Sequence, residues 1–323
     1  MALRNLLAKW LLPAVVAVTM AAVSTAAFAA KGVIKLHEGD WTGNLVDGKL
    51  AQIILEDEMD YKVKMIFLPS GPVVFEAIIG GEIDAAFEYW PSYNPTKDVY
   101  FTKWGGDGSL EYISEVGVIG QSGWYVPRYV IEGDAERGIA AVAPDLKTFA
   151  QLDKYKSLFT VPETAPQGRL LACPVAAWQC MDAERIEGLG LDYKAVVLGS
   201  ELAHWTEFEA AYARGEPIIA YAWEPHWIHA KLDLVEIGLP EYSDDAWPAA
   251  DWPEDITFNF GSVTLKERYP DVHQLIGNIR LTNAQQAGMI LDVDVNEMDL
   301  EAAVRKWMAA NEEIWRGWIP APM

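Results

Sequence analysis

The sequence predicts an α/β protein of two lobes, in which each lobe is a mostly parallel sheet flanked by helices. Two distant stretches carry this prediction, because residues 81–91 read GEIDAAFEYWP and residues 215–225 read GEPIIAYAWEP. A Gly that ends a helix, followed by an apolar run closed by Pro, is typical of the helix-to-strand half of an α/β unit. Trp90 and Trp223 should then lie at the carboxyl ends of two strands, where open α/β sheets form their binding crevices.

The order of the elements supports one such unit at the start of the chain. Alternating and helical patterns predict strand, helix, strand, helix and strand in turn, over residues 32–37, 42–59, 61–68, 71–79 and 83–89. This order implies a parallel sheet with crossover helices. A second unit of strand, helix and strand is predicted over residues 193–198, 201–213 and 217–223.

The remaining segments indicate where the chain passes between the lobes. Residues 122–130 resemble a strand that carries the chain into the second lobe, and residues 258–265 are strand-like again. Residues 233–255, rich in Pro, Asp and Trp, are expected to be irregular, and the chain is helical from residue 269 onward. With two crossings, residues 30–125 and 258–323 form lobe I, and residues 126–257 form lobe II.

The first 29 residues have the pattern of a secretory signal peptide. Arg4 and Lys9 give a basic start, residues 11–23 are apolar, and Ala27 and Ala29 frame a small-x-small cleavage site. The apolar run is shorter than the roughly 20 residues that a spanning helix needs. We therefore expect the mature protein outside the cytoplasm, in the periplasm if the source is Gram-negative.

Composition argues against a nucleic-acid partner and favours a binding site that contains aromatic residues. The chain has 47 acidic and 25 basic residues, a formal net charge of −22, so nucleic acid is not expected as a partner. Its 14 Trp residues are a heavy aromatic load, and Trp is enriched at binding sites.

No motif predicts an enzyme, a cofactor or a metal. The sequence has no Gly-x-Ser-x-Gly elbow, no His-Glu-x-x-His pair and no glycine-rich phosphate loop. Residues 292–296 imitate the start of a calcium loop, but Glu297 replaces the Gly that such a loop needs and Ala303 replaces its bidentate Glu.

The two Cys residues, Cys173 and Cys180, predict a disulfide. In an exported protein the oxidising compartment favours the bond. It would enclose Trp178 and hold that ring in a rigid loop. A bond that only staples a surface turn is the alternative.

Several motifs together resemble a known family. They are residues 38–42 (EGDWT), 87–91 (FEYWP), 123–130 (GWYVPRYV), 173–180 around Trp178, and 222–227 (AWEPHW). The chain is similar to the glycine betaine/choline class of ABC-transporter substrate-binding proteins, which includes trimethylamine N-oxide-binding relatives. The resemblance implies a type II periplasmic-binding-protein clamp, with the ligand in the cleft between the lobes.

The resemblance also implies an aromatic box, drawn from both lobes, around a trimethylammonium head group. Trp90, Trp178 and Trp223 match the box positions of the family, and Trp41 matches a position used in choline-type members. The implied partners are a small methylated amine and a membrane ABC permease with its cytoplasmic ATPase, and we expect a monomer. Residues 175–177 (VAA) depart from the Gly-rich loop of betaine members.

Polar groups near these motifs would hold the other end of the ligand. The sequence offers Thr42 and Gly43 at a helix start, which suits a carboxylate. Further candidates are Arg128, His226, a fifth aromatic ring at Trp124, and four acids, Asp40, Glu88, Glu132 and Glu224. These acids favour a ligand without a carboxylate.

The sequence does not distinguish among several ligands. Glycine betaine and trimethylamine N-oxide are the first candidates. Choline and carnitine are alternatives of the same class. A secreted carbohydrate-binding protein is a different class, because sugars also stack on Trp.

Overall fold

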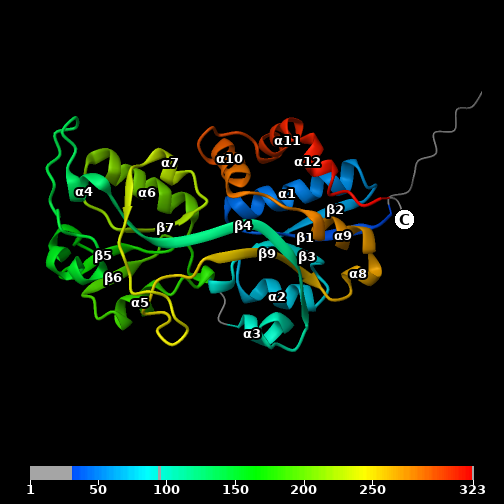
Figure 1. Ribbon diagram of the computed structural model, residues 1–323, viewed down its shortest axis with the longest axis horizontal. Helices are drawn as coiled ribbons and strands as arrows, with labels where there is room; N and C mark the ends of the chain where they lie inside the picture. The colour runs from blue at the N-terminus through cyan, green and yellow to red at the C-terminus, as the bar shows by residue number, and fades with distance from the viewer. Residues whose placement is uncertain (1–30, 94–95, 322–323) are drawn as a thin grey trace, which may run out of the picture.

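The computed structural model (Figure 1) describes residues 31–93 and 96–321. The predicted signal peptide lies outside these residues. Across the two described ranges, none of the helices combines the length and the apolar character required to cross a membrane.

In residues 31–93 and 96–321, nine strands build two sheets that share one long strand. The order along the combined path is β2-β1-β3-β9-β4-β7-β5-β6, and β8 also pairs with β4. The strands are β1 (Val33–Glu38), β2 (Lys62–Phe67), β3 (Ala85–Tyr89), β4 (Leu110–Pro127), β5 (Gly168–Leu171), β6 (Tyr193–Val196), β7 (Ala220–Glu224), β8 (Leu234–Glu236) and β9 (Asp255–Ser262). Figure 1 shows the two lobes on either side, with β4 running through both.

The pairing of β4 marks the passage between the lobes. Its first part pairs with β9 as far as Gly120, and its second part pairs with β7 from Gln121 onward. The return passage lies just before β9, since Asp255 pairs with Gly120. These positions lie a few residues before the predicted lobe boundaries at 125 and 257.

Helices cover both faces of each sheet. Lobe I carries α1 (Thr42–Asp57), α2 (Pro72–Ile79), α3 (Lys97–Tyr100), α8 (Leu265–Arg268), α9 (Pro270–Asn278), α10 (Asn283–Asp294), α11 (Leu300–Ala310) and α12 (Glu312–Arg316). Lobe II carries α4 (Arg128–Glu132), α5 (Asp182–Gly188), α6 (Glu201–Arg214) and α7 (Ile228–Lys231). In Figure 1, α10 lies at the edge of lobe I that faces lobe II.

Local chemistry explains where the main helices start and stop. Ser200 caps α6, because its hydroxyl accepts from the backbone N–H of Ala203, and Gly215 ends that helix in the left-handed conformation with φ 72°. Thr282 begins α10 with a capping box, and Pro72 occupies the first turn of α2. The expected α/β class and the βαβαβ start of the chain are confirmed.

The parallel strands predicted for each lobe are present, namely β2-β1-β3 in lobe I and β6-β5-β7 in lobe II, and the crossing strands β4 and β9 add antiparallel pairs because they run between the lobes in opposite directions. One predicted strand was wrong in its bounds. The strand predicted over residues 122–130 begins at Leu110 and gives way to α4 after Pro127. Gly117 and Gly120 interrupt the apolar alternation of its first half, so the pattern did not reveal it.

Candidate ligand-binding site

A cavity lies between the lobes and collects the four indoles that the sequence singles out. Its empty volume is about 720 Å³, including its opening to solvent. Lobe I contributes Trp41 and Trp90, and lobe II contributes Trp178 and Trp223. We call these four residues the aromatic box. Trp90 directly follows β3 and Trp223 lies near the end of β7, as the paired motifs predict.

Three of the four box indoles meet edge to face, and one of these contacts crosses the cleft. The rings of Trp41 and Trp178 have centroids 6.0 Å apart at 72°, and those of Trp178 and Trp223 are 5.6 Å apart at 82°. Trp178 therefore bridges a ring of lobe I and a ring of lobe II. Edge-to-face packing leaves indole faces free to meet a ligand.

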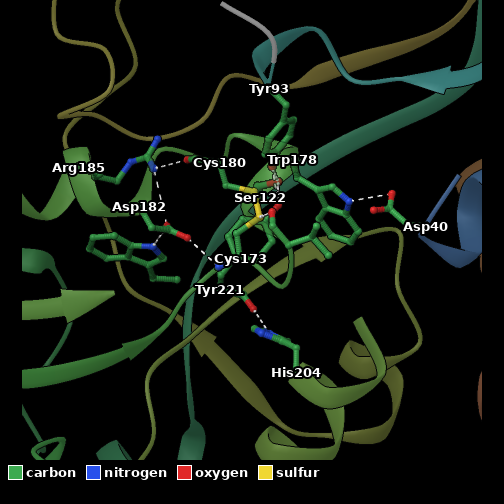
Figure 2. The surroundings of a disulfide bond; sticks show 12 residues. Asp40, Tyr93, Ser122, Cys173, Trp178, Cys180, Asp182, Arg185, His204 and Tyr221 are labelled. Atoms are coloured by element: carbon green, nitrogen blue, oxygen red, sulfur yellow. Dashed lines mark hydrogen bonds and ion pairs between the residues drawn. A yellow bond between two sulfur atoms is a disulfide. The ribbon is translucent and has the colours of Figure 1, made fainter. Parts of the chain in front are cut away.

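The disulfide is present and anchors the loop that carries Trp178 (Figure 2). Cys173 and Cys180 are bonded, and a short turn, η4 (Ala176–Trp178), lies between them. Below the loop, the Asp182 carboxylate accepts from the backbone N–H of Cys173 at 2.8 Å, and the Arg185 guanidinium donates to the carbonyl of Cys180 at 3.1 Å. The loop is thus held at both ends.

One hydrogen bond ties this loop to the opposite lobe. The indole N–H of Trp178 donates to Oδ1 of Asp40 at 3.0 Å, as Figure 2 shows. The same oxygen accepts from the hydroxyl and the backbone N–H of Ser70 in lobe I. Asp40 therefore fixes the orientation of a lobe II ring from lobe I.

Glu88 is the acid of the cavity wall. It is 1% exposed, and its carboxylate accepts from the indole N–H of Trp41 at 2.9 Å and of Trp90 at 3.2 Å. Burial raises the pKa of Glu88 well above its ordinary value, and the nearby Asp47 carboxyl adds to the rise, while the two indole donors oppose it. One acid thus orients two box rings and can exist either ionised or neutral.

The backbone at Glu88 and at Gly43 allows the Glu88 carboxylate to reach the two indoles. Glu88 has φ 53°, in the left-handed region that non-glycine residues rarely occupy. Gly43 lies against it, since a Cβ at Gly43 would be 2.4 Å from Oε2 of Glu88. Gly43 therefore makes room for the carboxylate and does not line the cavity.

Gly120 leaves room for the ring of Trp90, as Gly43 does for the carboxylate of Glu88. A Cβ at position 120 would lie 2.1 Å from Cζ3 of the indole, so Gly120→Ala must displace the ring.

We expect Gly120→Ala to weaken ligand binding about tenfold, the order of one lost cation–π contact. Calorimetry measures this, with Gly288→Ala as control, because a Cβ at Gly288 meets nothing within 4 Å. Equal affinities of the two variants would contradict the tight fit at Trp90.

A hydroxyl cluster closes another wall of the cavity. The hydroxyls of Tyr93 and Tyr221 are 2.6 Å apart, and both hydrogen-bond with Ser122 of β4. Both tyrosines line the cavity. Sequence reasoning missed them, although Tyr221 precedes Trp223 by two positions on a strand and so shares its face.

Five predicted ligand-binding residues do not line this cavity: Thr42, Gly43, Trp124, Glu132 and His226. Trp124 is buried and donates to Asp182, so it packs lobe II beneath the loop. Glu132 has a 59% exposed side chain that pairs with Arg128. Thr42 and His226 lie together at a separate contact between the lobes.

That contact contains a cluster of potential metal ligands. Glu201, His226 and Asp294 offer one atom each within 4.8 Å of one another. Burial lowers the pKa of His226 to about 3 and raises that of Glu201 to about 7. His226 is therefore neutral at physiological pH.

Comparisons with known proteins agree with this architecture. A family model described as the substrate-binding domain of the ABC-type glycine betaine transport system matches residues 32–310. The chain is 24% identical, over 92% of its length and 94% of the relative's, to a trimethylamine N-oxide-binding protein of Pelagibacter ubique (strain HTCC1062).

Solved structures share the fold at low identity. A choline-binding ABC-transporter protein in complex with choline matches with a TM-score of 0.68 at 18% identity, covering 89% of this chain and 92% of that one. Lactococcal OpuAC, closed on glycine betaine, matches with a TM-score of 0.66 at 16% identity, covering 90% and 100%. The two-lobed clamp is thus confirmed, and the chain belongs to the family of substrate-binding domains of ABC-type glycine betaine transport systems, which serves transport and not catalysis.

Proposed function

We propose that the aromatic box captures a small trimethylammonium solute whose other end is an N-oxide oxygen or a hydroxyl, with trimethylamine N-oxide as the first candidate and choline as the second. The protein would do so in the periplasm, as a monomer, and deliver the solute to a membrane permease driven by a cytoplasmic ATPase. Glycine betaine and carnitine are expected to bind more weakly.

The aromatic box suits the head group. A trimethylammonium carries positive charge but has no N–H, so it gains little from hydrogen-bond acceptors and much from an apolar, electron-rich indole face. Each desolvated contact contributes roughly 0.5–2 kcal/mol. Four such faces support micromolar affinity after ordering costs are subtracted.

Glu88 is the observation that carries the choice of ligand. No Lys or Arg lines the cavity in the described part of the chain, and Glu88 is its buried acid. His37 also lines it, but burial lowers the pKa of this imidazole, so it adds no positive charge at neutral pH. A ligand carboxylate would meet no cation and would be repelled by an ionised Glu88.

Both favoured ligands can use Glu88. A neutral Glu88 carboxyl can donate to the oxygen of trimethylamine N-oxide while its oxygens still accept from the two indoles. An ionised Glu88 can accept from the hydroxyl of choline. The curated relative that binds trimethylamine N-oxide supports the first of these.

Calorimetry on the purified mature protein tests the proposal. The panel is trimethylamine N-oxide, choline, glycine betaine, carnitine and a neutral sugar. We expect trimethylamine N-oxide or choline to bind at least about tenfold more tightly than glycine betaine, the order of one uncompensated buried charge contact. Tightest binding of glycine betaine would refute the role of Glu88, and binding of the sugar alone would refute the trimethylammonium site.

A further inference from the structure

The cluster of Glu201, His226 and Asp294 joins the two lobes beside the aromatic box. Glu201 begins α6 and His226 follows β7, both in lobe II, whereas Asp294 ends α10 in lobe I. The side chains of Glu201, His226 and Asp294 are 10%, 1% and 18% exposed. Protein contacts, and not solvent, therefore surround most of this cluster.

Each lobe supplies a carboxylate that accepts a hydrogen bond from the other lobe. Glu201 of lobe II accepts at Oε2 from the backbone N–H of Thr42 in lobe I, at 3.2 Å. Asp294 of lobe I accepts at Oδ2 from the indole N–H of Trp227 in lobe II, at 2.8 Å. The hydroxyl of Thr42 also donates to Oδ1 of Asp294 at 2.8 Å, which orients that carboxylate.

The tautomer of His226 argues against a metal ion here. Its Nδ1 accepts from the backbone N–H of Ile228 at 3.2 Å, so the proton of the neutral ring is on Nε2. Nε2 then donates to Oε1 of Glu201 at 3.2 Å. A metal would need the lone pair of that nitrogen, and would leave Nδ1 protonated against the Ile228 donor.

The cluster touches the box from both sides of the cleft. Thr42 directly follows Trp41 in the chain. In lobe II, the His226 ring stacks on Trp205 at 4.3 Å and lies 4.8 Å from the ring of Trp223. Separation of the lobes at this point would break the hydrogen bonds of Thr42 to Glu201 and of Trp227 to Asp294.

We propose that Glu201, His226, Asp294, Thr42 and Trp227 form a clasp that holds the two lobes closed and sets the rate of ligand release. These are positioning residues, since none of them lines the cavity. The inference rests on the proposed function only for the identity of the ligand whose release is timed. Thr42 and His226 thereby have a role other than the ligand contact that the sequence suggested.

Trp227→Phe tests the clasp by removing one indole N–H while keeping an aromatic ring. We expect the dissociation rate of the ligand, from stopped-flow fluorescence, to rise roughly tenfold, as expected for one hydrogen bond to a charged group. The association rate should stay within about twofold of wild type, because affinity differences between related complexes lie mostly in dissociation. Asp294→Asn should raise the dissociation rate likewise.

Trp315→Phe is the matched control. It removes an indole N–H that donates to the carbonyl of Met308 within lobe I, away from the cleft. Its dissociation rate should equal that of wild type. An unchanged dissociation rate in Trp227→Phe, or a slower association with unchanged dissociation, overturns the clasp.

Two further measurements separate the clasp from the ligand assignment and from a metal site. Small-angle scattering of the ligand-free protein should show a larger radius of gyration for Trp227→Phe than for Trp315→Phe, a result that does not depend on which solute the protein binds. Equal radii count against the clasp. A melting temperature that equimolar Zn²⁺ raises in wild type but not in Asp294→Asn would replace the clasp by a metal site.

Discussion

Trp178→Ala is expected to weaken binding of the trimethylammonium ligand by roughly 30-fold or more, or about 2 kcal/mol. The substitution removes one aromatic face together with the contacts to Trp41 and Trp223. It also removes the hydrogen bond to Asp40 across the cleft. Trp178 is half-buried in a loop held by the disulfide, so lobe II should keep its fold. Calorimetry gives the affinity and thermal unfolding the stability.

The control for this prediction is Trp307→Ala. Trp307 is also half-buried, but it stacks on Trp318 in lobe I and does not line the cavity. Its affinity should match wild type. Similar losses in both variants would mean that Trp178 acts through general stability. Trp223→Ala is a poorer probe, because Trp223 is 5% exposed and packs against Trp205, so its loss would also lower stability.

Glu88→Gln is expected to have the second largest effect, about a tenfold loss of affinity for trimethylamine N-oxide or choline. The amide removes the charge, and its NH₂ must face one of the two indole donors that the carboxylate now satisfies. Affinity for glycine betaine should fall less or rise, because the repulsion of its carboxylate disappears. Glu224→Gln is the control, since that exposed acid follows Trp223 but does not line the cavity. A uniform loss across the panel would show that Glu88 only holds the indoles.

The pH dependence of binding separates the two favoured ligands. An N-oxide needs the neutral form of Glu88, so its affinity should fall as pH rises through the raised pKa of this group. A choline hydroxyl needs the ionised form, so its affinity should rise over the same interval. Calorimetry from mildly acidic to mildly alkaline pH gives the sign. Glu88→Gln should flatten either profile, and a slope that persists in this variant would assign the titration to another group.

Local pattern was enough to predict the α/β units, the strand-end positions of Trp90 and Trp223 and the disulfide-held loop of Trp178, whereas the assembly of these rings into a box was implied by the resemblance to the betaine/choline class. Trp90 and Trp223 follow apolar strands, and a strand that enters a crevice must place its last residues at the mouth. Trp178 lies between two Cys residues whose pairing follows from their spacing and compartment. Each of these inferences uses residues that are close in sequence.

Local sequence pattern did not show which of the polar candidate residues line the cavity. Glu88 and Glu132 look alike in the sequence, yet one is 1% exposed beneath two indoles and the other is largely exposed beside Arg128. Thr42 and His226 were expected at the ligand and instead meet Glu201 and Asp294 between the lobes. Burial and partners depend on contacts between segments that are far apart in the chain.

The sequence by itself determined the α/β units, the strand-end positions of Trp90 and Trp223 and the disulfide-held loop, because apolar periodicity, helix ends and short spacings are local properties; the clamp and the full set of box indoles were implied by the resemblance to the betaine/choline class. Only the tertiary structure decided that Trp178 crosses the cleft to Asp40, that Glu88 is the acid of the cavity, and that Thr42 and Trp227 join the lobes. The physical reason is that a hydrogen bond or a raised pKa depends on which distant groups the fold brings within a few ångströms and removes from water.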